Sequence, residues 1–350
     1  MTILTLDMGK DKSVGCTFVA ETGEHAFMSL RTCPSEVAGC IEQIHPDRVV
    51  IEIGPLAGWV ADLVRGMGIE LQVANPNHEA WRWRKVKAKT DRLDALKLAR
   101  LSAMNQLPLV HVPPVAERQW RALIAYRQAL VARRTRIKNR IRALLEAQGL
   151  KGLRDGQSAW SQESLAALKL LAQALAEVPI EELWKGILWT ELAELEAVAG
   201  HMATIEARLD ALGRADERVQ RLQQIPGVGK RMAETVVAFI GDPHRFKSGK
   251  QVGCYAGLTP RPFNSGKQNR SGGISGEGNR HLRSMLIEVS WLALHLNPWL
   301  RELYERIRRG SSVRKKIAIV AVARRLLVRC WAMLRDGTDW QQPQPTNQAA

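Results

Sequence analysis

The chain has 350 residues, with 51 lysines and arginines against 35 aspartates and glutamates, and a formal net charge of +16. The electrostatic field of such a positively charged chain favours binding of polyanions, so nucleic acid is the first partner to consider. The sequence contains no apolar run long enough to cross a membrane and no signal-peptide pattern, so we expect a cytoplasmic protein with no membrane role. The five cysteines show no C-x-x-C spacing, which argues against a zinc site and a disulfide framework.

The first hundred residues alternate between strand and helix patterns. Strands are predicted at 2–9, 15–20, 24–30, 48–54 and 70–76. Helices are predicted at 35–44, 56–68 and 87–103, with Thr90 as the N-cap of the last one. Three strands followed by alternating helices and strands predict a mixed α/β sheet.

Two long helices are predicted in the middle of the chain, at 115–148 and 181–213. In the first, apolar residues recur every seven positions, a spacing typical of coiled coils: Leu123, Leu130, Ile137 and Leu144. Basic residues surround that seam, whereas the second helix is acidic. The two helices can therefore pair within one chain or between chains. The cations Arg133, Arg134 and Lys138 fit either a solvated helix face or a groove for a nucleic-acid backbone, and the net charge favours the groove.

Four acidic residues of the first hundred stand out by their positions. Asp7 ends the first strand, and Glu52 lies on a buried strand among β-branched residues. Asp91 and Asp94 share one face of the following helix. Each has an ordinary explanation. A strand-end aspartate caps a turn, a strand glutamate pairs with a core lysine, and aspartates in the first turn of a helix interact favourably with the helix dipole.

Together, two acids on strands and two on the following helix predict a site for divalent metal at one edge of the sheet. Carboxylate oxygens suit Mg²⁺, and two metal ions about 3.5–4 Å apart would hold the attacking and leaving oxygens of a phosphodiester. The stretch before the helix supplies cations for a phosphate track: Arg82, Arg84, Lys85 and Lys87. Trp81 and Trp83 suit either base stacking or packing beside the sheet.

The segment 257–291 is predicted as a loop of small and basic residues that leads into a helix. Its glycines let backbone amides approach a phosphate, and nearby cations can neutralise one: Arg261, Lys267, Arg270, Arg280 and Arg283. Ser265 is either a turn serine or a nucleophile. Tyr255 is a weaker nucleophile candidate because its surroundings are apolar. The "IPGVG" stretch at 225–229 fits a DNA-binding hairpin and a simple helical corner about equally.

The order Asp7, Glu52 and Asp91-x-x-Asp94 resembles the RuvC-like branch of the ribonuclease H fold. "GLTPRPFNSGKQNRSGGISGEGNRHLR" resembles the signature of the DEDD transposases of bacterial insertion sequences, the insertion sequence 110 family with its 1111 subgroup. The resemblance spans nearly the whole chain. Family members often carry Ser-Ser-Gly where this chain has Asn264-Ser265-Gly266, and Lys267 replaces a common second glycine. Ser271 and Ser275 are weaker competitors for the nucleophile.

The resemblance implies an α/β plus α architecture with four parts. They are a RuvC-like domain (1–110), a helical coiled-coil middle (111–215), a mainly helical C-terminal transposase domain (216–338) and a disordered tail (339–350). It implies Asp7, Glu52, Asp91 and Asp94 as ligands of divalent metal and Ser265 as the nucleophile of DNA recombination. Donor and target DNA, a guiding non-coding bridge RNA, and assembly as homodimers and homotetramers are the implied partners. In that assembly, one protomer's RuvC-like domain completes the site of another.

Two other functions fit the residues less well. A hydrolytic nuclease of the Holliday-junction resolvase type would use the acids to activate water and would form no covalent intermediate. A non-catalytic nucleic-acid-binding scaffold would use the same acids for stability alone. Trapping a covalent protein–DNA adduct separates the recombinase from both.

Overall fold

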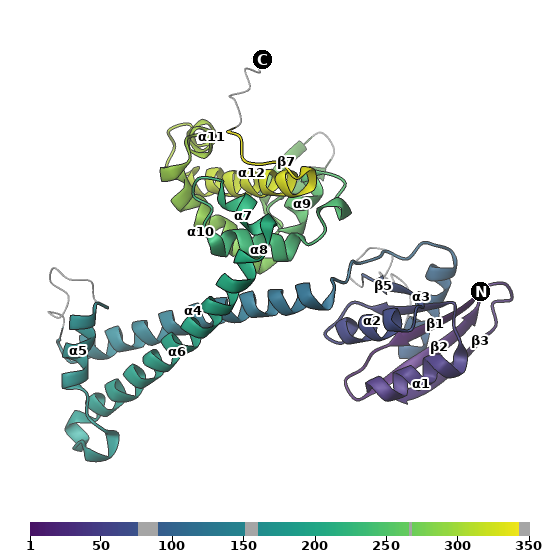
Figure 1. Cartoon of the computed structure of the whole chain (residues 1–350), viewed down its shortest axis with the longest axis horizontal. Coiled ribbons are helices and arrows are strands. Elements are labelled where there is room, and N and C mark those ends of the chain that lie inside the picture. The colour runs from purple at the N-terminus through teal and green to yellow at the C-terminus, as the bar shows by residue number, and fades with distance from the viewer. Residues whose placement is uncertain (76–89, 151–159, 266–267, 343–350) are drawn as a thin grey trace. The chain divides into compact units, whose positions relative to one another are not determined.

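The computed structural model describes residues 1–75, 90–150, 160–265 and 268–342 (Figure 1). The chain forms two compact units, Met1–Arg118 and Gln119–Ala350. The helical middle of the chain shares one hydrophobic core with the C-terminal segment. Most of the predicted disordered tail, 343–350, lies outside the described residues. None of the described helices is both long and apolar enough to span a lipid bilayer.

The first unit is built on a mixed five-stranded sheet, as the sequence predicts. Its strands are Thr2–Asp7 (β1), Lys12–Val19 (β2), His25–Arg31 (β3), Arg48–Glu52 (β4) and Glu70–Ala74 (β5). Their order is β3-β2-β1-β4-β5, with β1, β2 and β3 antiparallel, and with β4 parallel to both β1 and β5. The parallel strands β1, β4 and β5 all end at the same edge.

Three helices cover the two faces of this sheet: Pro34–Ile44 (α1), Ala57–Gly66 (α2) and Asp91–Ala103 (α3). The residues of β1 alternate between the faces. Leu4 and Leu6 pack in the core with α1 and α2, whereas Ile3 packs in the core with α3. The predicted N-cap is confirmed, since the Thr90 side chain accepts a hydrogen bond from the Leu93 amide at 3.4 Å.

Two long helices follow, Val115–Ala147 (α4) and Leu183–Arg214 (α6), with Gln162–Leu171 (α5) between them. The first unit ends within the first turns of α4, and the rest of α4 belongs to the second unit. Short 3₁₀ turns lie at Leu175–Glu177 and Ile180–Glu182. Ion pairs join the basic and acidic helices within the chain: Arg127–Glu206, Arg133–Glu194 and Arg140–Glu191 at 2.6, 2.7 and 3.2 Å. Within the described chain, the charge complementarity noted in the sequence is thus satisfied by intramolecular pairing.

The buried stripe of α4 differs from the predicted seven-residue seam. Leu130 and Ile137 are buried as predicted, but Leu123 and Leu144 are only partly buried. Full burial falls instead on positions next to the seam: Ile124, Ile141 and Leu145. An α-helix with 3.6 residues per turn drifts by roughly 20° per heptad against a strict seven-residue repeat, which moves neighbouring positions into the interface.

The remaining elements pack around one central helix. They are Glu217–Gln223 (α7), Lys230–Ile240 (α8), a 3₁₀ turn at Pro243–Arg245, Gly249–Tyr255 (α9), Arg280–Leu296 (α10), Pro298–Arg308 (α11) and Lys315–Asp336 (α12). Helix α12 buries one face along its length and contacts α7, α8, α9, α10 and α11. Trp340, in the chain that follows, packs against Trp299 with ring centroids 5.9 Å apart.

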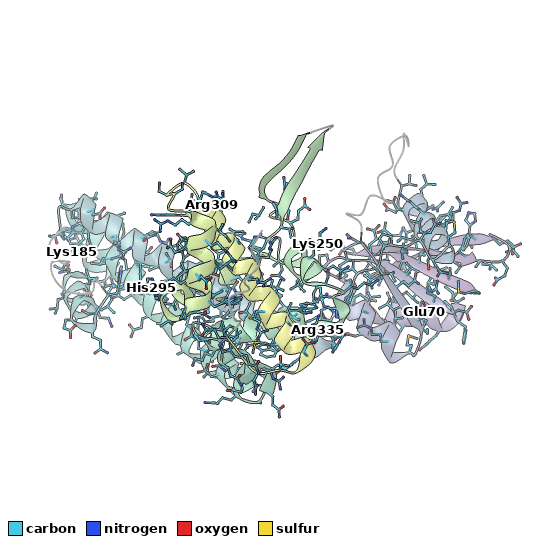
Figure 2. The ribbon with its side chains drawn as sticks, turned by 90° about the horizontal axis from the view of Figure 1, so that it is seen from above. Glu70, Lys185, Lys250, His295, Arg309 and Arg335 are labelled. Atoms are coloured by element: carbon cyan, nitrogen blue, oxygen red, sulfur yellow. The ribbon has the colours of Figure 1, made fainter. Side chains whose placement is uncertain are left out.

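The predicted loop after residue 257 is wrong in its first part, which forms a β-hairpin. Its strands are Pro260–Ser265 (β6) and Gln268–Ile274 (β7), paired antiparallel as a sheet of their own. The base of the hairpin lies beside α12. Beyond this base, the hairpin projects from the helices of its unit, as the paired green strands in Figure 2 show. Prolines and glycines obscure the two-residue alternation of these strands, so their composition indicates a loop.

Replacing Ile137 by alanine tests the α4–α6 packing. Ile137 is fully buried, so loss of its side chain should lower the free energy of unfolding by about 2–4 kcal/mol. Ile180, 77% exposed, provides the matched control, and Ile180→Ala should cost less than about 0.5 kcal/mol. Urea unfolding of the full chain measures both. Equal effects, or a midpoint for Ile137→Ala that rises with protein concentration, would contradict intramolecular packing.

Candidate active site

Asp7 and Glu52 end neighbouring parallel strands. Strand β1 pairs with β4 up to Leu6 opposite Ile51, so the next residues in this register are Asp7 and Glu52. Both are half-buried. Side chains opposite each other in a parallel pair lie on the same face of the sheet, so the two carboxylates share one face at the carboxyl edge.

Helix α3 packs on that same face and runs antiparallel to β1 and β4. The Thr5 hydroxyl donates to the Ala95 carbonyl at 2.9 Å, near the start of the helix. At the other end of the sheet, the Arg48 guanidinium donates to the Ser102 carbonyl at 3.2 Å. The N-terminus of α3 therefore lies at the carboxyl ends of β1 and β4, beside Asp7 and Glu52.

The aspartates of α3 continue its buried stripe toward this edge. Ala95 and Leu98 are buried against the sheet, and Asp91 and Asp94 each precede one of them by four residues, which is about one helical turn. Asp94 is half-buried and Asp91 is exposed. All four predicted acids thus belong to one edge of the sheet, where the helix dipole also favours negative charge.

A lysine of α3, Lys97, lies among these acids. Burial lowers the pKa of the Lys97 ammonium, while the nearby carboxylates of Asp94 and Glu52 raise it. Lys97 lies one turn after Asp94 on α3 and is half-buried. Its charge offsets part of the repulsion that neighbouring carboxylates exert on each other.

The donor chemistry of the four acids fits a divalent cation. Asp7, Glu52, Asp91 and Asp94 supply hard carboxylate oxygens, the ligands that Mg²⁺ and Ca²⁺ prefer. Among the described residues, no three histidine, cysteine, aspartate or glutamate side chains are gathered closely enough to hold a metal ion. Carboxylates that share a site repel one another unless a cation compensates, so separation of these four is the expected arrangement of the protein alone.

The residues predicted to contact nucleic acid before α3 and on α4 fall into two groups. Arg82, Arg84, Lys85 and Lys87, with Trp81 and Trp83, lie outside the described residues. On α4, Arg133 pairs with Glu194, and the Lys138 ammonium lies 4.7 Å from the ring centroid of Trp160. Burial lowers the pKa of Lys138, and the neighbouring charges of Arg134 and Arg142 lower it further.

Ser265 is the last residue of β6, and its backbone pairs with Gln268 of β7. Lys267 lies outside the described residues, and Arg270 occupies the middle of β7 opposite Phe263. Among the competing serines, Ser271 pairs with Pro262 on the hairpin, whereas the Ser275 amide donates to the Thr259 carbonyl at its base. Ser265 is thus at the end of the hairpin farthest from the helices.

The base of the hairpin is an interlocked pair of backbone segments. The Asn279 amide donates to the Tyr255 carbonyl at 2.8 Å. A Cβ on Gly257 would lie 1.8 Å from the Glu277 carbonyl oxygen, and one on Gly278 would lie 2.4 Å from that of Tyr255. Both glycines also have positive φ, of 67° and 91°. This close approach fixes the root of the serine-bearing hairpin on the helical core.

Three predicted phosphate contacts lie around this base. Arg283 donates to the Ala256 carbonyl at 3.1 Å, so its guanidinium takes part in the interlocked structure. Arg261 donates to the Ser275 carbonyl at 2.6 Å and remains 55% exposed. Arg280 is exposed at the N-terminus of α10, where the Asn279 side chain caps the helix by accepting from the Leu282 amide.

The two other motifs that the sequence raised have packing explanations. Gly227 of "IPGVG" has φ of 89°, and a Cβ there would lie 2.7 Å from Ala293 on α10. The turn at 225–229 is therefore packed against the core. Tyr255 lies edge-on to Phe246 and 4.7 Å from the Arg245 guanidinium. These contacts account for both motifs without a catalytic role.

Sequence reasoning missed the basic run between Arg306 and Arg335. It contains ten lysines and arginines and no aspartate or glutamate. Counting charges along the sequence would have found it. The run forms the end of α11 and most of α12, next to the hairpin base.

Two parts of the chain match known protein families. Residues 6–148 match a transposase family, DEDD_Tnp_IS110, and residues 219–305 match the Transposase IS116/IS110/IS902 family. The chain is 31% identical to the transposase for insertion sequence element IS1111A of Coxiella burnetii, over 95% of this chain and 89% of that protein. It is 29% identical to a probable family 20 transposase of Pseudomonas aeruginosa, over 86% and 87%. A pilin gene-inverting protein of Moraxella lacunata is 27% identical over 71% and 67%.

Replacing Gly257 by alanine tests the interlocked base of the hairpin. The added methyl would collide with the Glu277 carbonyl, so Gly257→Ala should lower the free energy of unfolding by about 3 kcal/mol or more. Gly276 has nearly the same φ, 68°, but nothing within 4 Å of its Cβ position, so Gly276→Ala should cost only about 1 kcal/mol. Thermal unfolding compares the two, and equal losses would show that backbone conformation alone matters there.

Proposed function

The chain belongs to the IS116/IS110/IS902 family of transposases, and we propose that it cuts and rejoins DNA through a covalent phosphoserine intermediate at Ser265. It is a DNA transposase, an enzyme that acts on DNA. The observation that carries the proposal is the placement of Asp7, Glu52, Asp91 and Asp94 at one edge of the sheet. A scaffold protein has no need for four acids at one edge of a domain in a chain of net charge +16.

We assign the first unit to the RuvC-like branch of the ribonuclease H fold. The sheet order, with three antiparallel strands followed by two parallel ones, supports this assignment, as do the acids at the ends of β1 and β4. DEDD transposases use divalent metal, and we infer Mg²⁺, held by Asp7, Glu52, Asp91 and Asp94. When bound there, the metal supplies charge neutralisation for a phosphodiester and its leaving oxygen.

The proposed chemistry is an exchange of one ester bond for another. The Ser265 oxygen attacks the scissile phosphorus and loses its proton, while the bond from phosphorus to one deoxyribose oxygen breaks. That oxygen takes up a proton and leaves as a free hydroxyl. A hydroxyl of another DNA end then attacks the phosphoserine and releases the serine, so the bond energy is conserved for rejoining.

Residues around the hairpin have defined tasks in this scheme. Arg280 is exposed at the start of α10 and is available to a phosphate. Arg261, beside the hairpin base, pairs with exposed Glu277 at 3.8 Å and would exchange this partner for a phosphate. Lys267 and Arg270 follow Ser265 in sequence and add positive charge near the attacked phosphorus. Arg283 acts through the structure by holding the hairpin base.

Rejoining fits the comparisons better than hydrolysis does. The relative from Moraxella lacunata is named a gene-inverting protein, and inversion requires that cut ends be joined again. By the same family resemblance, we propose guidance by a bridge RNA and assembly as homodimers and homotetramers. In this assembly the functional division is a RuvC-like part, 1–110, a coiled-coil α4–α6 middle, 111–215, and a transposase part, 216–338. The RuvC-like part of one protomer serves the hairpin of another.

The test is a trapped protein–DNA adduct. Purified protein is incubated with RNA from the flanks of its element, donor and target DNA, and Mg²⁺, and is then run on a denaturing gel. Wild type should give a DNA-linked band that disappears in Ser265→Ala, because no other group then forms the phosphoserine. Ser275→Ala is the matched control, since its backbone lies at the hairpin base, and it should keep the band. Cleavage by Ser265→Ala, with no adduct in either protein, would identify a hydrolytic nuclease instead.

A further inference from the structure

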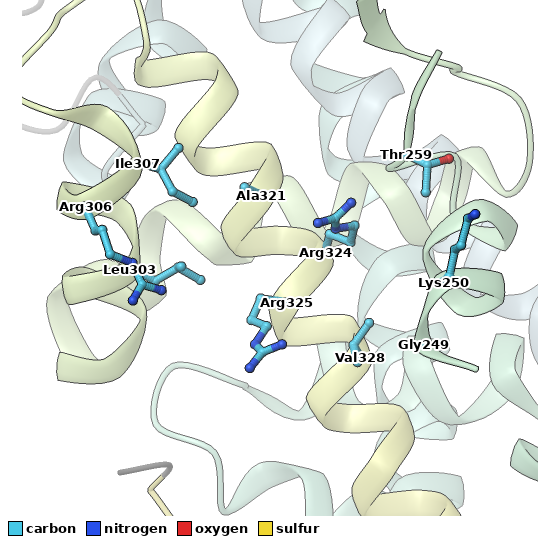
Figure 3. A pocket seen from close by; sticks show the side chains of 10 residues that line it. All are labelled: Gly249, Lys250, Thr259, Leu303, Arg306, Ile307, Ala321, Arg324, Arg325 and Val328. Carbon is cyan, nitrogen blue, oxygen red and sulfur yellow. The ribbon is translucent and has the colours of Figure 1, made fainter. Parts of the chain in front are cut away.

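A basic cavity of about 560 Å³ lies on the second unit between α9, α11 and α12. Figure 3 shows Arg324 and Arg325 on α12, with Lys250 of α9 on one side and Arg306 of α11 on the other. Thr259, directly before the hairpin, adds a hydroxyl to the same wall. Among the residues that the structure describes, no acidic side chain lines the cavity.

Two glycines position the central arginine of this cavity. A Cβ on Gly249 would lie 2.8 Å from Val328, and one on Gly253 would lie 3.3 Å from the Arg324 Cδ. These glycines are one turn apart on α9, so they let α9 approach α12 closely. The aliphatic stem of Arg324 therefore lies against Gly253, which limits its rotamers and directs its guanidinium along the wall.

The cations of the cavity lack acidic partners. Within the described ranges, no ion pair involves Lys250, Arg306, Arg324 or Arg325, although Arg308 nearby pairs with Glu305. All four side chains are exposed. On α4, by contrast, three arginines are paired with glutamates of α6. Positive charges gathered without acids repel one another, so their clustering here indicates a site for an anionic ligand.

A second cavity, of about 370 Å³, adjoins the first along α12. It shares Arg324 and Ala321 with the first cavity, and Lys316 lies at its other end. Gly272 and Gly273 of β7 form its opposite wall, where the missing side chains leave the backbone accessible. The two cavities together form a groove, from Lys316 to Val328 on α12, that leads to the base of the serine-bearing hairpin.

We propose that this groove binds the phosphodiester backbone of a nucleic-acid strand and leads it to the hairpin. Its length along α12 is about 18 Å, which matches about five nucleotides of a B-form strand. Repeated cations, a hydroxyl and accessible backbone amides suit successive phosphates, which are read without regard to sequence. The inference rests on the proposed function, because that function explains why a nucleic-acid strand would pass along the groove. Binding to the groove is measured separately from cleavage.

The test compares two variants that remove equal charge. In the groove variant, Arg306→Gln is combined with Arg324→Gln. In the control, Arg208→Gln is combined with Arg214→Gln, since both are exposed on α6 outside the groove. Fluorescence anisotropy of the full chain is measured with single-stranded DNA, single-stranded RNA and duplex DNA of one sequence, between about 50 and 200 mM salt.

The groove variant should bind roughly tenfold more weakly at about 100 mM salt, and its log–log salt slope should fall by about 1.4–1.8 for two lost phosphate contacts. The control should keep the wild-type slope. The probe that loses most identifies the strand as DNA or RNA. An unchanged slope in the groove variant, or an equal loss in the control, would overturn the proposal.

Melting temperatures establish that both variants are folded, and photo-crosslinking of wild-type protein gives a second measurement without substitution. Peptides of α12 that contain Arg324 should carry the crosslinked nucleotide, and crosslinks confined to other elements would contradict the groove. Weakened binding with no protein–DNA adduct in wild type would leave the groove standing and reject the serine mechanism. An adduct in wild type, together with unchanged binding in the groove variant, would support the serine mechanism and reject the groove.

Discussion

The packing of α3 across one face of the sheet is the contact on which the active-site account depends. Hydrogen bonds from Thr5 and Arg48 to the backbone of α3 hold this helix antiparallel to β1 and β4. This direction brings the first turn of α3 to the strand ends that carry Asp7 and Glu52. With the opposite direction, Asp91 and Asp94 would lie at the far edge, and no common site would exist.

The edge of the sheet could be predicted because strand and helix patterns are local. Asp7 and Glu52 end neighbouring strands, so parallel pairing places them at one edge, and Asp91 and Asp94 open a capped helix that packs antiparallel to these strands. The β6–β7 hairpin could not be predicted, because its pairing depends on the interlocked base at Gly257 and Gly278 rather than on local alternation. The electrostatic interaction of Lys97 with Glu52 also could not be predicted, because it depends on the packing of α3 against β4.

The net positive charge of the chain serves two different purposes. On α4, arginines pair with glutamates of α6 and help to join two helices within the chain. On α11 and α12, cations line a groove that leads toward the hairpin, and they have no acidic partners in the described part of the chain. Composition alone cannot separate these purposes, since both regions read as basic helices. Pairing in the folded chain distinguishes cations that stabilise the protein from those available to a polyanion.

The central claim is that the acidic edge and the serine-bearing hairpin act in the same phosphoryl transfer. The most direct measurement is the yield of protein–DNA adduct formed by Glu52→Gln, which keeps Ser265 and nearly the shape of Glu52 but removes its charge. The account predicts that this variant binds DNA and folds like wild type yet forms no adduct. An adduct at the wild-type yield would contradict it, because the serine would then react without the acids.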